Sequence, residues 1–123
     1  MSERRKTCVI VEDEFLISAD LARLCRKFGV EVLADASTAE QAYDVLATIE
    51  PDYVLMDVRL GGRRDGVDVA EWMHERHPET RIIYVTGSNE PPILERINAD
   101  HPHRILIKPV APRLLEEAFG LRA

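Results

Sequence analysis

The stretch at residues 51–57, Pro-Asp-Tyr-Val-Leu-Met-Asp, constrains the fold of this chain more than any other part of the sequence. A mostly apolar run that opens at a proline and closes before a glycine-rich loop (60–66) is typical of a strand buried on both faces. Asp57 follows directly where this strand should end. Because α/β proteins bind ligands beyond the carboxyl ends of parallel strands, we expect Asp57 to lie at the mouth of a site.

Apolar and β-branched runs predict five strands, and helical spacing of apolar residues predicts a helix after each of them. The expected strands are 7–11, 30–34, 52–56, 81–86 and 104–107; the expected helices run from the acids 12–14 to Gly29, from the segment 37–40 to Pro51, and over 67–77, 91–98 and about 112–121. Strands that alternate with helices form a parallel sheet with helices on both faces, because crossover connections are right-handed. The sequence therefore predicts a single α/β domain.

For two of these helices the sequence predicts details beyond the bounds: how one begins and which side chains of the other face the core. The segment 37–40, Ser-Thr-Ala-Glu, matches a capping box that begins at Ser37. The last helix is expected to direct four apolar side chains inward: Leu114, Leu115, Ala118 and Phe119.

The composition excludes several classes of protein. With 16 basic and 22 acidic residues the net charge is −6, which argues against a general nucleic-acid binder. No apolar run approaches the ~20 residues of a membrane span, and the run at 8–11 is too short for the core of a signal peptide. We therefore expect a cytoplasmic protein with neither a nucleic-acid nor a membrane partner.

The cysteines and histidines are not expected to form a site. Cys8 and Cys25 lie inside apolar patterns without metal-ligand spacing, so we interpret them as small core residues rather than a disulfide. The four histidines are interpreted as solvated surface residues rather than ligands. They are His74, His77, His101 and His103.

Polar side chains follow four of the five expected strands at the point where each strand ends. They are Glu12 and Asp13 after the first strand, Asp57 after the third, Thr86 at the end of the fourth, and Lys108 after the fifth. Since the carboxyl ends of parallel strands meet at one edge of a sheet, these side chains are predicted to share one site.

The chemistry of this set favours phosphoryl transfer. Carboxylates this close cannot all remain ionised without compensation, and Mg²⁺ suits a site of few carboxylates that keeps several waters. With Lys108 as a positive charge and Thr86 as a hydroxyl donor, Asp57 could act as a nucleophile and form an acyl phosphate. Each signal alone also has an ordinary explanation: the acids as a helix N-terminus, and Asp57, Thr86 and Lys108 as turn or loop residues.

The chain resembles the receiver domains of two-component response regulators along its whole length. The resemblance is carried by the segment 9–14 (Val-Ile-Val-Glu-Asp-Glu), Asp57, Thr86-Gly87 and Lys108-Pro109. It implies a flavodoxin-like, doubly wound fold with five parallel strands in the order 2-1-3-4-5, and one receiver domain over residues 1–123. It also implies dependence on Mg²⁺ and phosphorylation by a histidine kinase or a histidine phosphotransfer protein.

The same resemblance implies a role for each motif residue. Asp13, Asp57 and the backbone carbonyl of Arg59 would be metal ligands, and Glu12 would act through water. Lys108 and Thr86 would contact the phosphoryl group of a 4-aspartylphosphate at Asp57. The Lys108-Pro109 bond would be cis, which only proline makes inexpensive.

The chain departs from the family pattern at two positions. Glu12 stands where most members have the first residue of an Asp pair, and its longer side chain should still reach a metal-bound water. Ile105 stands where most members have the aromatic residue to which the threonine movement is coupled.

Tyr84-Val85-Thr86-Gly87 and the loop 60–66 are similar to a subgroup of stand-alone receivers with a Phe-Ala-Thr-Gly-type motif, in which the segment after strand four is mobile. The segment 91–98 opens with two prolines and has few apolar anchors, so we expect it to be the most mobile element.

The sequence stops shortly after the last expected helix, so we expect a single-domain receiver that binds a downstream protein or passes phosphate on. A monomer or a weak homodimer is expected.

Phe15 and Leu16 are predicted to help dock the kinase; alternatively, Phe15 packs under a loop. Arg59 and Ser88 are predicted to tune the lifetime of the phosphate.

Three alternatives are less well supported. An Asp-nucleophile phosphohydrolase usually has a second acid two residues after the nucleophile, where this chain has Arg59. A flavin carrier of the same fold needs a phosphate-cradling loop after strand one, where the acids 12–14 would repel phosphate. A degenerate scaffold would not need the full set of acids together with Thr86 and Lys108.

Overall fold

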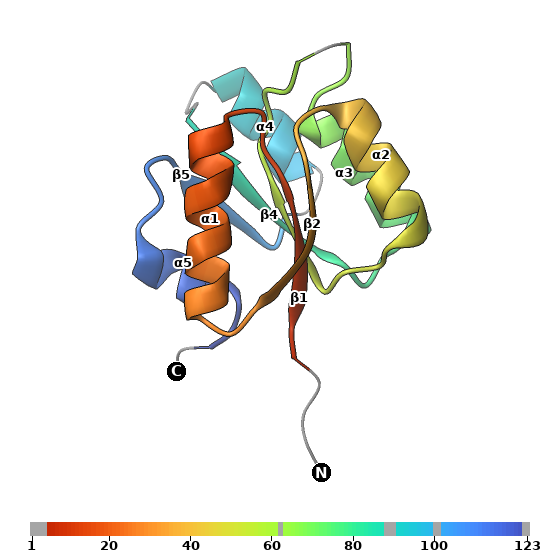
Figure 1. Cartoon of the computed structure of the whole chain (residues 1–123). Coiled ribbons are helices and arrows are strands. Elements are labelled where there is room, and N and C mark those ends of the chain that lie inside the picture. Colours follow the sequence, from red (N-terminus) through yellow and green to blue (C-terminus); the bar gives the residue numbers. More distant parts are fainter. Residues whose placement is uncertain (1–4, 62, 88–90, 100–101, 122–123) are drawn as a thin grey trace.

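A five-stranded parallel sheet forms the centre of the molecule, with its strands in the order β2-β1-β3-β4-β5 (Figure 1). The strands are β1 (Thr7–Val11), β2 (Glu31–Ala36), β3 (Tyr53–Met56), β4 (Arg81–Thr86) and β5 (Arg104–Ile107). The computed structural model describes residues 5–61, 63–87, 91–99 and 102–121. Every residue of β1 and β3 is buried, as apolar strands in the middle of a parallel sheet require. The predicted flavodoxin-like α/β fold is confirmed.

Five helices cover the two faces of this sheet. They are α1 (Phe15–Lys27), α2 (Ala39–Thr48), α3 (Gly66–Arg76), α4 (Pro91–Ala99) and α5 (Pro112–Ala118). Helices α1 and α5 lie on one face, and α2 and α3 lie on the other (Figure 1). Two apolar clusters follow from this arrangement, one beneath α1 and α5 and one beneath α2, α3 and α4. No helix in the described part of the chain is both long enough and apolar enough to span a membrane.

Backbone hydrogen bonds continue past the strand ends and fix where the polar residues emerge. The N–H of Asp57 donates to the carbonyl of Val11 at 2.9 Å, so Asp57 leaves the sheet beside the end of β1. The N–H of Lys108 donates to the carbonyl of Thr86 at 2.9 Å, which ties the end of β5 to the end of β4. The predicted shared edge therefore exists.

The predicted ends of helices and strands are correct to within a few residues, with two corrections at the C-terminus. Gly29 ends α1 with φ +76°, in the left-handed region that was expected there. The last helix ends at Ala118 rather than Leu121, because Gly120 turns the chain with φ +71°. Leu114 was expected to point inward, but it is 41% exposed.

The start of α2 differs from the predicted capping box. Thr38, not Ser37, is the N-cap, and its side chain accepts a hydrogen bond from the N–H of Gln41 at 3.1 Å. The Gln41 side chain accepts in turn from the N–H and the hydroxyl of Ser37 at 2.8 and 2.9 Å. Since Gln41, not Glu40, accepts hydrogen bonds from the residue before the cap, the predicted role of Glu40 was wrong.

Both cysteines are free and buried, as predicted for core residues. Their sulfur atoms lie 3.6 Å apart between β1 and α1. Burial and the neighbouring thiol raise the pKa of Cys8, with the hydrogen bond to Cys25 as the largest cause.

Two histidines are not the solvated surface residues that were expected. Nε2 of His77 lies 3.1 Å from the carbonyl oxygen of Leu46, and Nε2 of His103 lies 2.8 Å from that of Ala118. Both side chains are half-buried and join a helix to a neighbouring element. His101 lies outside the described residues.

Candidate functional site

A cavity of about 600 Å³ opens at the carboxyl ends of β1, β3, β4 and β5. Its lining includes five of the six predicted site residues: Asp13, Asp57, Arg59, Thr86 and Lys108. The sixth, Glu12, lies beside it and lines the adjacent cavity of about 430 Å³. The side chains that the strand order predicted to meet are therefore together.

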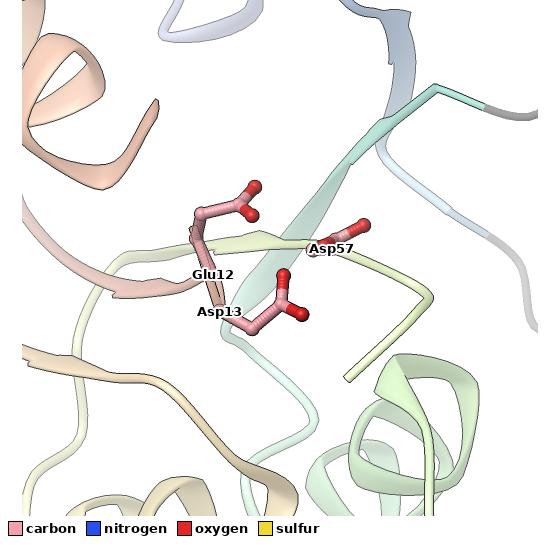
Figure 2. Close-up of side chains that lie close together, drawn as sticks. All are labelled: Glu12, Asp13 and Asp57. Carbon is pink, nitrogen blue, oxygen red and sulfur yellow. The ribbon is translucent and has the colours of Figure 1, made fainter. Parts of the chain in front are cut away.

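Three carboxylates converge at the base of this cavity (Figure 2). One oxygen each from Glu12, Asp13 and Asp57 lies within 4.8 Å of the others. Glu12 and Asp57 are buried, with 3% and 4% of their surface exposed, whereas Asp13 is exposed. Such a set of hard oxygen donors, open to solvent on one side, fits a divalent cation that keeps part of its water shell.

Lys108 brings a positive charge to these acids. Its Nζ lies 2.9 Å from Glu12 Oε1 and 3.4 Å from Asp57 Oδ2. Burial alone would lower the pKa of Lys108, but the two carboxylates outweigh that effect and raise it above its ordinary value. The Lys108-Pro109 peptide bond is cis, as the family resemblance implied.

One lysine does not compensate the acids fully. Burial is the largest effect on Asp57, and repulsion from Glu12 adds to it, so the pKa of Asp57 is raised to about 7 although Lys108 opposes the shift. Glu12 Oε1 is buried, and its 2.9 Å contact with Lys108 Nζ is an ion pair that lacks hydrogen-bond geometry. The residues present therefore fit a bound cation. Its charge would favour the ionised form of Asp57 and would offset the burial of the Glu12 carboxylate.

Thr86 and Arg59 complete the wall of the cavity. Thr86 is buried at the last position of β4, whereas Arg59 is exposed in the loop after β3. Ser88, which was paired with Arg59 as a tuning position, lies outside the described residues.

One close backbone contact beneath the site was not predicted from the sequence. A Cβ built on Gly66, the first residue of α3, would lie 2.0 Å from the backbone oxygen of Asp57. The N–H of Gly66 also donates to the carbonyl of Val58 at 2.8 Å. A lone glycine in a glycine-rich loop does not show which neighbour approaches it, so only the three-dimensional structure could identify this position.

The start of α1 presents apolar side chains to solvent next to the cavity. Phe15 and Leu16 are 82% and 79% exposed, so the alternative in which Phe15 packs under a loop is wrong. Leu16 lines a groove of about 430 Å³ that continues to Lys108 and Pro109.

Comparison with known proteins agrees with the resemblance to receiver domains. The family model described as the response regulator receiver domain matches residues 8–119. The transcriptional regulatory protein PdtaR of Mycobacterium tuberculosis is 33% identical over 101 residues, which are 82% of this chain and 48% of that protein. The chain thus spans about half the length of this curated relative.

Solved structures of receiver domains superpose on nearly the whole chain. The signal receiver domain of a modulated diguanylate cyclase from Desulfovibrio desulfuricans G20 is similar with a TM-score of 0.88 and 29% identity, covering 96% of this chain and 93% of that one. A CheY-like receiver domain protein from Methanospirillum hungatei JF-1 has a TM-score of 0.86 and 25% identity, covering 95% and 92%. The chain belongs to the response regulator receiver domain family.

Proposed function

We propose that this chain is a phosphoacceptor in a two-component phosphorelay, with Asp57 as the residue that is phosphorylated. A carboxylate oxygen of Asp57 attacks the phosphorus of a phosphohistidine, the phosphorus–nitrogen bond breaks, and the imidazole leaves. The observation that carries this proposal is the placement of Asp57 in one cavity with Lys108 and Thr86, beside two further acids. Attack of water on the acyl phosphate later returns the carboxylate and releases phosphate. In this proposal the chain catalyses its own phosphorylation and dephosphorylation and does not turn over a separate substrate.

The surrounding residues have distinct roles in this proposal. Lys108 neutralises a phosphoryl oxygen, and the hydroxyl of Thr86 donates a hydrogen bond to another. Asp13, Asp57 and the backbone carbonyl of Arg59 would hold Mg²⁺, with Glu12 acting through a water. When bound, the cation supplies the positive charge that the acids and the transferred oxygens need.

The donor is a histidine kinase or a histidine phosphotransfer protein, as for receiver domains in general. The exposed Phe15 and the groove behind Leu16 offer it an apolar docking surface beside the cavity. We further propose that residues 1–123 act as one cytoplasmic receiver domain, as a monomer or a weak homodimer, without a nucleic-acid or membrane partner. Phosphorylation then switches binding to a downstream protein, or the phosphate is passed on.

Intact mass tests the proposal most directly. The wild-type chain incubated with Mg²⁺ and a small acyl phosphate should gain the mass of one phosphoryl group, which should disappear with time as the acyl phosphate hydrolyses. Asp57→Asn should gain none, and a chelator should abolish the gain in wild type. A stable adduct, or one that persists in Asp57→Asn, would contradict the assignment.

The turnover of a generic phosphate ester separates this proposal from a phosphohydrolase. Continuous release of phosphate far beyond one equivalent of protein would favour the enzyme instead. The exposed Arg59, at the position where such enzymes usually carry their second acid, favours slow single release.

A further inference from the structure

An ion pair joins α4 to the first turn of α3 across 31 residues of sequence. The guanidinium of Arg96 donates to both carboxylate oxygens of Asp65, at 2.6 and 3.3 Å, and its Nη2 lies 3.8 Å from Asp68. Burial opposes the charge of Asp65, yet its bonds to Arg96 and to the Asp68 amide outweigh that effect and lower its pKa. Because the planar guanidinium contacts both oxygens, the pair restricts the orientation of the Asp65 carboxylate relative to Arg96 as well as the distance between them.

Asp65 is also the residue that starts α3. It is the N-cap of that helix, with its side chain accepting from the N–H of Asp68 at 3.1 Å while its own N–H donates to Asp68 at 2.9 Å. The same carboxylate thus caps the N-terminus of α3 and forms the ion pair with Arg96 of α4.

The residue after Asp65 touches the loop that carries the candidate phosphoacceptor. Gly66 donates its N–H to the carbonyl of Val58 and approaches the backbone oxygen of Asp57 so closely that no side chain fits between them. Asp65 is thus linked to Asp57 through two packed backbone segments, with no flexible side chain in between.

Helix α4 has few other attachments to the body of the protein. Among its nine residues, all of which are described, Ile97 is the one that is buried. The Arg96 side chain is 46% exposed and that of Asp65 is 28% exposed, so a pair like this adds little to global stability. The consequence of the pair is then positional rather than energetic.

We propose that Arg96 is a positioning residue for the site: through Asp65 it holds the loop of Asp57, so that the position of α4 and the geometry of the acidic cavity depend on each other. By reciprocity, a change at Asp57 that moves this loop also alters the attachment of α4. This route does not involve Ile105, which occupies the usual aromatic position. Where the change at Asp57 is its phosphorylation, this proposal rests on the proposed function.

The first test needs neither metal nor phosphate. Amide hydrogen exchange at Gly66 in the metal-free protein reports the hydrogen bond to Val58. Arg96→Gln and Asp65→Asn should each speed this exchange about 3- to 10-fold, and the double variant no more than either single one. Asparagine can still cap α3, so Asp65→Asn removes the ion pair and leaves the cap in place.

The second test is the dissociation constant of Mg²⁺ by calorimetric titration. Removing a positive charge near the acids should by electrostatics alone tighten Mg²⁺ binding, and removing a negative one should weaken it. Positioning predicts instead that both Arg96→Gln and Asp65→Asn weaken it by about 3- to 10-fold. Arg96→Lys should lie between wild type and Arg96→Gln, since lysine keeps the charge but not the paired contact.

Arg23→Gln is the matched control, because Arg23 forms a comparable exposed pair with Asp20 at 2.8 Å on α1. It should leave Gly66 exchange unchanged and should not weaken Mg²⁺ binding. Unchanged exchange in Arg96→Gln, additive effects in the double variant, or opposite signs for the two single variants would each overturn the proposal.

The third test is the rate of phosphorylation by a small acyl phosphate, measured by intact mass. This rate should fall in both Arg96→Gln and Asp65→Asn. If wild type accepts no phosphate at Asp57, the proposed function fails, while Gly66 exchange still decides the role of Arg96. If wild type is phosphorylated and Arg96→Gln reacts, exchanges and binds Mg²⁺ as wild type does, the positioning role fails and the proposed function stands.

Discussion

At the scale of single residues, the site combines charges that oppose one another. Asp57 is buried beside Glu12, and its pKa is raised to about 7 in the absence of a cation. A carboxyl with a raised pKa binds its proton more tightly in the folded than in the unfolded chain, so its ionisation destabilises the fold as the pH rises from about 4 to 7. The buried acidic group is thus a source of instability in the metal-free protein when it is ionised.

Asp57→Asn should therefore stabilise the metal-free protein above neutral pH. Asparagine removes the buried charge, and we expect a gain on the order of 1–3 kcal/mol at pH 8 that shrinks towards pH 5. Urea unfolding of both chains in a chelator at the two pH values measures this. Added Mg²⁺ should narrow the difference at pH 8 by stabilising wild type, and an equal difference at both pH values would contradict the sign.

Gly66→Ala should be strongly destabilising because of the contact with the backbone of Asp57. The added methyl would meet a carbonyl oxygen that cannot rotate away, so we expect a loss of about 3 kcal/mol in the free energy of unfolding. Gly61→Ala is the control, since nothing lies within 4 Å of a Cβ at Gly61, and it should change stability by less than about 0.5 kcal/mol. Similar urea midpoints for the two variants would show that the loop yields easily.

Arg59→Asn should change the rate at which the phosphorylated chain loses its phosphate. Arg59 is exposed and lines the cavity. In the proposed mechanism it flanks the path of the attacking water, and asparagine is both shorter and uncharged. Intact mass against time after removal of the phosphodonor measures this rate. Identical decay in both chains would remove Arg59 from the path of the water.

At the scale of helices and strands, the sequence predicted what depends on local pattern. Strands β1, β4 and β5 have the predicted bounds, because β-branched runs between turns have few alternatives. Helix starts and ends were less predictable because they depend on which side chain closes the first turn. Ser37 and Thr38 are both good caps by composition, and the choice between them is made by how the chain leaves β2.

This choice of cap can be measured directly. Thr38→Ala removes the acceptor for the N–H of Gln41 and should cost about 1 kcal/mol of stability. Ser37→Ala leaves that acceptor in place and should cost clearly less, because the N–H of Ser37 still reaches the Gln41 side chain. Thermal or urea unfolding of both variants decides it; a larger loss in Ser37→Ala would restore the predicted capping box.

At the scale of the whole molecule, topology assembles the site. Strand order brings four strand ends to one edge, so Glu12, Asp13, Asp57, Thr86 and Lys108 could be grouped from sequence alone. Contacts between helices that are distant in sequence could not be predicted this way. The pairing of Arg96 with Asp65 and the approach of Gly66 to Asp57 depend on how α3 and α4 pack, which no short pattern encodes.

The exposed start of α1 leads to the prediction that concerns partners. Phe15 lies next to the cavity with 82% of its surface exposed, so its truncation should not affect the fold. If the phosphodonor protein docks there, Phe15→Ala should slow phosphotransfer from a histidine kinase or phosphotransfer protein about 10-fold, as loss of an aromatic anchor does at other interfaces. Phosphorylation by a small acyl phosphate, which needs no docking, should proceed at the wild-type rate.

Leu33→Ala is the control for this prediction. Leu33 is another exposed apolar side chain, 37% accessible on the edge strand β2, and it does not line the groove behind Leu16. Its truncation should leave both rates unchanged. Equal phosphotransfer in Phe15→Ala and wild type would show that the donor protein docks elsewhere, whereas slowing with both donors would show that Phe15 acts on the cavity itself. Only a loss confined to the protein donor agrees with a docking surface at the start of α1.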